Sequence, residues 1–159
     1  MSEPRDDDPR EQKRAARKQA MDLLARREHA RAELAAKLGQ RGYASHHVSV
    51  VLDELVAEGL LSDARYAAAM ITSKATHGYG PLYVFHALRQ AGVAEAEIAM
   101  ALDEAEVDWF TCARQARHKR FGHATPTDYP GKAKQMRFLQ RRGFDMDQIM
   151  AAFEDGPDE

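Results

Sequence analysis

The residues best suited to metal binding or nucleophilic chemistry are seven histidines and one cysteine, Cys112. A zinc site built on cysteines requires several of them at close spacing, so a single cysteine excludes such a site and an internal disulfide. His46 and His47 are adjacent, which places them on different faces of a helix. His77 and His86 are separated by a Gly- and Pro-containing stretch and lack the spacing of paired helical ligands. We therefore expect no metal site.

Paired carboxylates are the remaining candidates for acid–base catalysis. Asp53-Glu54 and Asp103-Glu104 recur at matching positions, but neighbours on a helix diverge by about 100° and do not share a site. We expect these pairs to be solvated helix ends. Gly131-Lys132 ends like a phosphate-binding loop, yet the upstream glycine and the magnesium-binding Ser/Thr are missing. A non-enzymatic protein without cofactors is expected.

Basic side chains form two groups whose chemistry is the binding of phosphate or of a polyanionic protein. The first group lies at three- and four-residue steps and predicts a solvent-facing stripe on one helix: Arg10, Lys13, Arg14, Arg17 and Lys18. The second group flanks a turn near the C-terminus: Arg114, Arg117, Lys119, Arg120, Lys132, Lys134, Arg137, Arg141 and Arg142. We predict that both groups contact the partner. A solvated face is the alternative for the first group, and a structural role is the alternative for Arg142, which directly precedes a glycine.

The two signs of charge are segregated along the chain, although the net charge is only −2. The segment 114–142 holds nine basic residues and a single acid, Asp128, so pairing within it cannot neutralise the excess. The segment 43–108 holds three basic and ten acidic residues. This segregation favours an oriented partner over indiscriminate coating of nucleic acid. No apolar run approaches the roughly 20 residues that span a bilayer, and the first 14 residues are charged throughout, so a cytoplasmic protein is expected.

A repeat positions these charges. Leu-x-x-x-Gly followed by an apolar residue recurs at a spacing of 50 or 51 residues, with the glycines at Gly42, Gly92 and Gly143. The same pattern marks a further helix end at Gly59. A left-handed glycine just past a helix end, with an apolar contact across it, is the Schellman motif. Apolar residues between these ends follow helical spacing, and no alternating strand pattern is present.

The pattern predicts an all-α protein of three tandem three-helix repeats, forming an elongated, curved helical array. The repeats are assigned to residues 10–60, 61–106 and 107–155, between disordered tails at 1–9 and 156–159. The predicted helices are 11–28, 30–41, 45–58, 62–77, 80–91, 95–106, 107–121, 130–142 and 146–154. Residues 33–61 also read as a helix-turn-helix, but the second helix of that pair contains no Lys or Arg.

Several short pieces of the sequence are distinctive in their order and spacing: Leu24-Ala-Arg-Arg27-Glu-His, Gly59-Leu-Leu-Ser-Asp63-Ala-Arg65-Tyr66, Gly78-Tyr-Gly80, and Phe138-Leu-Gln-Arg-Arg142-Gly143-Phe144. In these pieces the sequence resembles the RecX family, regulators of the RecA recombinase. These pieces extend over residues 20–153. Tyr66 stands where the family usually has Phe. We expect Asp63 and Arg65 to begin a helix with a local ion pair.

The resemblance implies a modulator that binds the RecA–single-stranded DNA filament, inhibits ATP hydrolysis and strand exchange, and limits filament growth. It thereby implies regulation of recombination, DNA repair and the SOS response. RecA and single-stranded DNA are the expected partners, and a monomer is expected. Two alternatives stay open: a helix-turn-helix regulator that binds duplex DNA, and a helical adaptor that recognises another protein.

Overall fold

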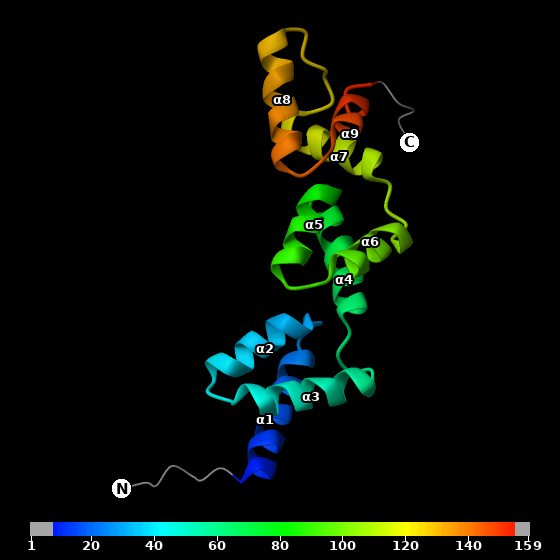
Figure 1. Cartoon of the computed structure of the whole chain (residues 1–159). Helices are drawn as coiled ribbons and strands as arrows, with labels where there is room; N and C mark the ends of the chain where they lie inside the picture. The colour runs from blue at the N-terminus through cyan, green and yellow to red at the C-terminus, as the bar shows by residue number, and fades with distance from the viewer. Residues whose placement is uncertain (1–7, 155–159) are drawn as a thin grey trace, which may run out of the picture.

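The computed structural model describes residues 8–154, and within this range the chain forms nine α-helices and no strand (Figure 1). The helices are α1 (Pro9–Leu24), α2 (Arg31–Gln40), α3 (Ser45–Ala57), α4 (Asp63–Thr76), α5 (Pro81–Gln90), α6 (Glu95–Glu104), α7 (Trp109–Phe121), α8 (Tyr129–Arg141) and α9 (Met146–Ala151). We call α1–α3 module one, α4–α6 module two and α7–α9 module three. The all-α class and the three three-helix units are confirmed.

The ends of α1 differ most from the prediction. Its first residue is Pro9, because the Asp8 side chain caps the helix by accepting a hydrogen bond from the Arg10 N–H at 3.0 Å. Its last residue is Leu24, four residues before the predicted end. Beyond it, the Arg27 guanidinium donates to both carboxylate oxygens of Glu33, at 3.1 and 2.7 Å, and this contact directs the chain into α2. The predicted tail at 1–9 is therefore wrong for Asp8 and Pro9, which cap and begin α1. Its residues 1–7 and the predicted tail at 156–159 lie outside the described residues.

The repeated glycines end α2, α5 and α8 as predicted. Gly42, Gly92 and Gly143 have φ values of 91°, 87° and 96°, in the left-handed region that glycine adopts without a Cβ penalty. In each case the N–H of the residue after the glycine donates to the carbonyl of the leucine in the repeated Leu-x-x-x-Gly pattern. These bonds run from Tyr43 to Leu38 at 3.3 Å, from Val93 to Leu88 at 3.1 Å and from Phe144 to Leu139 at 3.2 Å.

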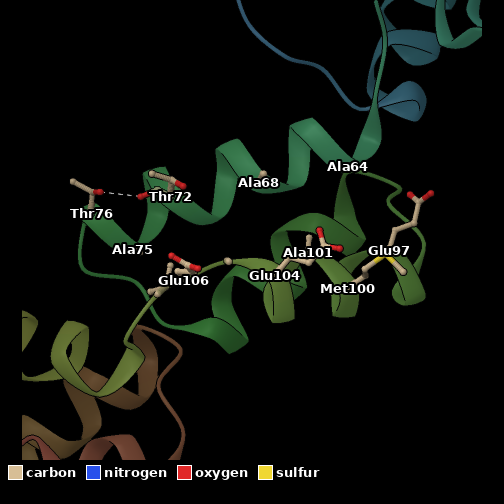
Figure 2. A pocket seen from close by; sticks show the side chains of 12 residues that line it. Ala64, Ala68, Thr72, Ala75, Thr76, Glu97, Met100, Ala101, Glu104 and Glu106 are labelled. Carbon is tan, nitrogen blue, oxygen red and sulfur yellow. Dashed lines mark hydrogen bonds between the residues drawn. The ribbon is translucent and has the colours of Figure 1, made fainter. Parts of the chain in front are cut away.

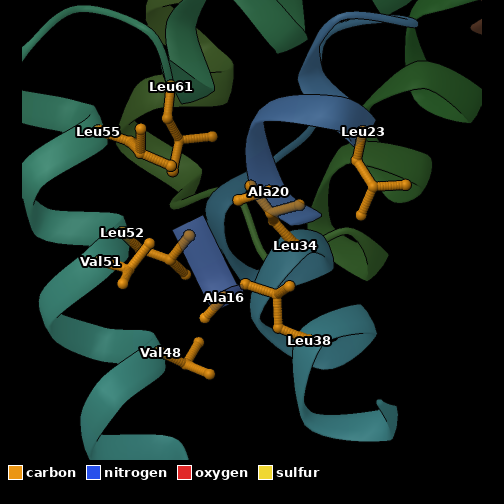
Figure 3. Close-up of a cluster of buried hydrophobic side chains, with 10 residues drawn as sticks. All are labelled: Ala16, Ala20, Leu23, Leu34, Leu38, Val48, Val51, Leu52, Leu55 and Leu61. Atoms are coloured by element: carbon orange, nitrogen blue, oxygen red, sulfur yellow. The ribbon is translucent and has the colours of Figure 1, made fainter. Parts of the chain in front are cut away.

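Each module has a separate hydrophobic core. In module one, side chains of α1, α2 and α3 converge on Leu34, Leu38, Leu52 and Leu55, all at most 1% exposed (Figure 3). The corresponding clusters are built on Ile71, Val84, Leu88 and Ile98 in module two, and on Leu139, Phe144 and Ile149 in module three. Burial of one side chain of this size stabilises the folded module by about 1.5–3 kcal/mol. Because the large buried side chains of each core come from helices of the same module, the position of each module relative to the next depends mainly on other contacts.

Modules two and three join where the C-terminal end of α8 meets the N-terminal end of α5 (Figure 1). The Gly80 N–H donates to the Arg142 carbonyl at 2.7 Å, and the Leu82 N–H donates to the Gly143 carbonyl at 2.9 Å. These bonds satisfy N–H groups that have no partner inside α5 and bring helix ends of opposite partial charge together. A Cβ on Gly80 would lie 2.5 Å from the Gly143 carbonyl carbon, so the two backbones touch.

Modules one and two join in a similar way. The C-terminal end of α5 faces α2, where a Cβ on Gly92 would lie 2.5 Å from the Cβ of Ala32. The Asp63 carboxylate accepts a hydrogen bond from the Arg31 N–H at 2.8 Å, and Arg65 pairs with Glu28 at 2.9 Å. The expected local ion pair between Asp63 and Arg65 is therefore wrong, because both side chains reach across to module one. The helices α2, α5 and α8 consequently stack end to end, and the array is elongated (Figure 1).

Candidate partner-binding surface

Positive charge is neutralised very differently in the three modules. Within residues 8–154, the structure has eight ion pairs, and all of them lie between Lys13 and Glu95. The exposed cations of α8, namely Lys134, Arg137 and Arg141, form no ion pair with another described residue. This agrees with the charge excess that the sequence predicts for segment 114–142. The exposed side of α8 thus presents cations without a paired carboxylate in the described part of the chain.

The predicted stripe on α1 is only partly solvent-facing. Lys13 and Arg17 reach across to α3, where Lys13 lies 3.7 Å from the Glu54 carboxylate and Arg17 lies 3.8 Å from it. Arg17 also pairs with Glu58 at 2.8 Å. The prediction of a free face is therefore wrong for these two residues. It is correct for Arg10, Arg14 and Lys18, which are exposed.

Acidic residues predicted to be solvated are partners in the same contacts. Glu54 receives both cations from α1, and Asp53 pairs with Arg31 at 2.8 Å. The exposed ion pairs each contribute about 0.2–1 kcal/mol. The pairs of Glu54 connect α1 to α3, and the pair of Asp53 connects α2 to α3.

Arg117 does not belong to the basic face, and that prediction is wrong. Its side chain is 2% exposed and lies between α7 and the helices that pack on it. Its Nε donates to the Ala152 carbonyl at 2.8 Å, and its Nη1 donates to the Gln135 Oε1 at 3.3 Å. The signal in the sequence is its spacing, four residues after the buried Ala113, which puts it on the core face. Arg117 therefore connects the three helices of module three.

The outer face of α8 carries three exposed cations. Lys134, Arg137 and Arg141 lie at helical spacing on the side opposite the buried Gln135 and Leu139. Exposed side chains at this spacing form one stripe, so their charges act together on a partner. We call Lys134, Arg137 and Arg141 the α8 basic face.

The other predicted cations surround this face or lie at the edges of module three. Lys119 and Arg120 are exposed at the end of α7, and Arg114 and Lys132 are half-buried. The Lys132 ammonium lies 5.7 Å from the centre of the Phe153 ring. The Arg114 Nε is buried and has no hydrogen-bond partner among residues 8–154.

Arg142 lies at the junction between modules two and three. Its guanidinium lies between two rings, 4.7 Å from the centre of Tyr79 and 5.0 Å from the centre of Phe138. Its Nη1 donates to the His77 carbonyl at 3.3 Å. Arg120 approaches the same Phe138 ring at 5.6 Å. Cation–π contacts of this kind contribute about 0.5–1 kcal/mol at exposed sites, so Arg142 helps to hold the junction.

Three residues at this junction were not predicted as part of the site. Lys74 lies 5.4 Å from the Tyr79 ring and 5.7 Å from the Tyr83 ring, and the two tyrosines stack with centroids 4.2 Å apart. All three residues lie in the acidic segment 43–108, and an excess of acidic residues in a segment gives no indication of a single lysine within it. The signal that could have found them is the four-residue spacing of the tyrosines.

A small cavity at this junction is lined by positive groups. Its volume is about 240 Å³, and its lining includes Lys119, Arg120, Arg142, His77 and Phe138, with no carboxylate. Guanidinium groups held on aromatic rings keep their edge N–H groups free to donate to an anion. The arrangement can receive a phosphate or carboxylate group. It continues the positive surface of module three toward module two.

Groups with other chemistry are absent from this surface. No cluster of three or more His, Cys, Asp or Glu side chains in residues 8–154 could hold a metal ion. Burial raises the pKa of the Cys112 thiol, which favours the protonated form over a reactive thiolate. Among the helices of the described chain, none is long and apolar enough to cross a membrane.

Comparison with protein families matches nearly all of the described chain to three consecutive domains. The descriptions are "RecX, first three-helix domain" for residues 16–55, "RecX, second three-helix domain" for 62–102 and "RecX, third three-helix domain" for 106–153. Regulatory protein RecX of Halorhodospira halophila is 47% identical over 138 residues, covering 87% of this chain and 86% of that protein. Regulatory protein RecX of Pseudomonas putida is 47% identical over 135 residues, covering 85% and 86%.

Solved structures share the fold. The crystal structure of RecX from Lactobacillus salivarius superposes with a TM-score of 0.76 at 19% identity, covering 89% of this chain and 94% of that one. A second crystal structure, of regulatory protein RecX, gives a TM-score of 0.76 at 22% identity, covering 89% and 71%.

Proposed function

The chain belongs to the RecX family of regulatory proteins, and we propose that it binds the RecA–single-stranded DNA filament and inhibits its activities. In this proposal the protein is a non-enzymatic, monomeric cytoplasmic modulator. It reduces ATP hydrolysis and strand exchange and limits filament growth. Recombination, DNA repair and the SOS response are the processes it regulates.

The observation that supports this function is the exposed positive charge of the α8 basic face. The α8 basic face has no carboxylate partner among the described residues, although ion pairs are frequent in modules one and two. Unpaired like charges repel one another, and a polyanionic partner removes that cost. A filament of protein and single-stranded DNA offers such charge at regular intervals, from phosphate and from acidic side chains.

The end-to-end stacking of the modules supports inhibition by contact with several neighbouring protomers of the filament. An elongated array can contact more than one protomer of a filament, whereas a compact domain of the same mass reaches fewer. The cations at the junction, including Arg120 and Arg142, extend the positive surface from module three toward module two. Contacts with neighbouring protomers would hinder the movements that accompany ATP hydrolysis.

Duplex recognition by a helix-turn-helix has less support. The third helix of each module is the candidate recognition helix, and α3, α6 and α9 contain no Lys or Arg. In addition, Asp53 and Glu54 make α3 acidic on the side facing α1 and α2. A helix without cations is poorly suited to a groove lined by phosphates.

The test is ATP hydrolysis by RecA on single-stranded DNA, titrated with this protein at two salt concentrations. The variant replaces Lys134, Arg137 and Arg141 with Glu and leaves Arg142 in place because it holds the junction. The unmodified protein should inhibit at less than one molecule per RecA. Three reversed contacts of about 0.5–1 kcal/mol each should weaken inhibition about ten- to a hundredfold.

The matched control makes the same change in net charge elsewhere. Arg26, Arg41 and Arg89 are exposed residues of modules one and two, and replacing them with Glu should leave inhibition within about twofold of the unmodified protein. Equal loss in both variants would show that net charge alone matters. Retained inhibition in the first variant would exclude the α8 basic face. No inhibition by the unmodified protein at equimolar ratio would reject the proposed function and favour the duplex-binding or adaptor alternative.

A further inference from the structure

A groove runs along module two between α4 and α6 (Figure 2). Its volume is about 640 Å³. Small side chains of α4 form one side, namely Ala64, Ala68, Thr72 and Ala75, and α6 contributes Met100 and Ala101 to the other. Met100 is 63% exposed. The lining is therefore mostly apolar and open to a partner.

The rim of this groove is acidic. Glu97, Glu104 and Glu106 belong to its lining, which contains no Lys or Arg. None of these three carboxylates takes part in the eight ion pairs found in residues 8–154. The groove thus combines an apolar floor with negative charge that the described chain leaves uncompensated.

Module one shows which groups fill the equivalent space. The buried Ala16 and Ala20 of α1 correspond to the buried Ala67 and Ile71 of α4 in the repeat. At the same offset of 51 residues, Lys13 and Arg17 correspond to Ala64 and Ala68. Glu54 corresponds to Glu104 at the offset of 50 residues that separates Gly42 from Gly92.

The contacts of module one therefore define what module two lacks. Lys13 and Arg17 cross from α1 to the Glu54 carboxylate, at 3.7 and 3.8 Å. Alanines at the two equivalent positions remove both cations, which opens the groove and leaves the Glu104 carboxylate without them. The complementary ligand supplies long basic side chains from outside the module.

We propose that this groove binds a basic helix of a partner protein. Lys or Arg side chains one turn apart would lay their methylene stems over Ala64 and Ala68 and place their charges at Glu97, Glu104 and Glu106. Small residues at one-turn spacing along α4 allow the backbone of such a helix to approach closely. The surface is separate from the α8 basic face and does not depend on the proposed function.

The test uses the full chain and a defined probe. The probe is a fluorescently labelled alanine-based helical peptide with Lys and Arg four residues apart, and its control has Glu at those positions. Binding is followed by fluorescence anisotropy. The variant Ala64→Lys/Ala68→Arg recreates the cations of module one inside the groove. The matched control, Ala69→Lys/Ala99→Arg, adds the same charge at exposed positions outside the lining.

The unmodified protein should bind the basic peptide saturably and the acidic peptide not at all. Ala64→Lys/Ala68→Arg should weaken binding at least tenfold. Ala69→Lys/Ala99→Arg should stay within about threefold, because its added charges are exposed outside the lining, where water and salt screen them. Unchanged helicity by circular dichroism confirms that both variants fold. Equal binding of the two peptides, or equal loss in both variants, would overturn the proposal. Self-association of the protein alone that Ala64→Lys/Ala68→Arg abolishes would assign the groove to a second copy and would also overturn it.

Discussion

Replacing Gly80 with alanine tests whether backbone contact at the start of α5 holds modules two and three together. Gly80 has φ −98° and ψ 176°, which alanine also adopts, so backbone strain does not contribute. The new Cβ would lie 2.5 Å from the carbonyl carbon of Gly143 and 2.7 Å from the Phe144 nitrogen. Both are backbone atoms, which cannot rotate away as a side chain can. The modules must therefore separate at this point.

Separation breaks the hydrogen bonds from Gly80 to Arg142 and from Leu82 to Gly143, each worth about 0.5–1.5 kcal/mol. It also removes the contact of Arg142 with the Tyr79 ring, worth about 0.5–1 kcal/mol. We therefore expect Gly80→Ala to lower the free energy that couples the two modules by about 1.5–4 kcal/mol. The separate hydrophobic cores should remain folded.

The assay is urea unfolding followed by circular dichroism and by the fluorescence of Trp109. This is the only tryptophan of the chain, and it packs against the cores of both module two and module three. In the unmodified protein the two signals should change together. In Gly80→Ala the fluorescence transition should shift to lower urea and separate from the circular dichroism transition.

The control is Gly39→Ala, which lies inside α2 and has no atom within 4 Å of the added Cβ. It should stabilise the protein by about 0.5–1 kcal/mol, because alanine favours the helix interior over glycine. Coincident transitions in Gly80→Ala with an unchanged midpoint would refute the idea that this contact couples the modules.

Two further predictions concern buried groups. Arg117→Met should lower the free energy of unfolding by about 2–6 kcal/mol, because the Ala152 carbonyl and the Gln135 amide oxygen each lose a buried donor at about 1–3 kcal/mol. The exposed control Lys119→Met should change it by less than about 0.5 kcal/mol in urea unfolding. His29 is buried, and burial lowers its pKa below the ordinary value, so the folded state favours the neutral ring. Stability should therefore fall as the pH drops below about 6.5, where the unfolded state gains the proton first, and His29→Gln should flatten this part of the stability–pH curve. A steeper dependence in His29→Gln, or a Lys119→Met loss equal to that of Arg117→Met, would contradict these assignments.

Helix ends and module cores could be predicted from the sequence, because they depend on local rules. Gly42, Gly92 and Gly143 end helices since each must adopt positive φ, and each is preceded by a leucine at a fixed distance. Helical spacing then identifies the apolar face of each segment. The charge excess of segment 114–142 is likewise visible by counting, and the cations of the α8 basic face form no ion pair with another described residue.

The location of individual charged residues was decided by tertiary structure. Spacing along α1 places Lys13 and Arg17 on an accessible side of the helix, but their partners are on α3, and only packing brings Glu54 within reach. Arg117 is charged and yet buried, because a carbonyl from α9 and an amide from α8 converge on it from distant parts of the chain.

The arrangement of the modules relative to one another also could not be predicted from local sequence patterns. The sequence determined three similar helical units with basic ends and an acidic middle. Only the tertiary structure decided that the C-terminal end of one helix meets the N-terminal end of another, through backbone contact at Gly80 and Gly143. That contact places Arg142 between Tyr79 and Phe138. The physical reason is that helix periodicity specifies which side of a segment is apolar, whereas the stacking of helix ends depends on the fit of backbones that lie about sixty residues apart in the chain.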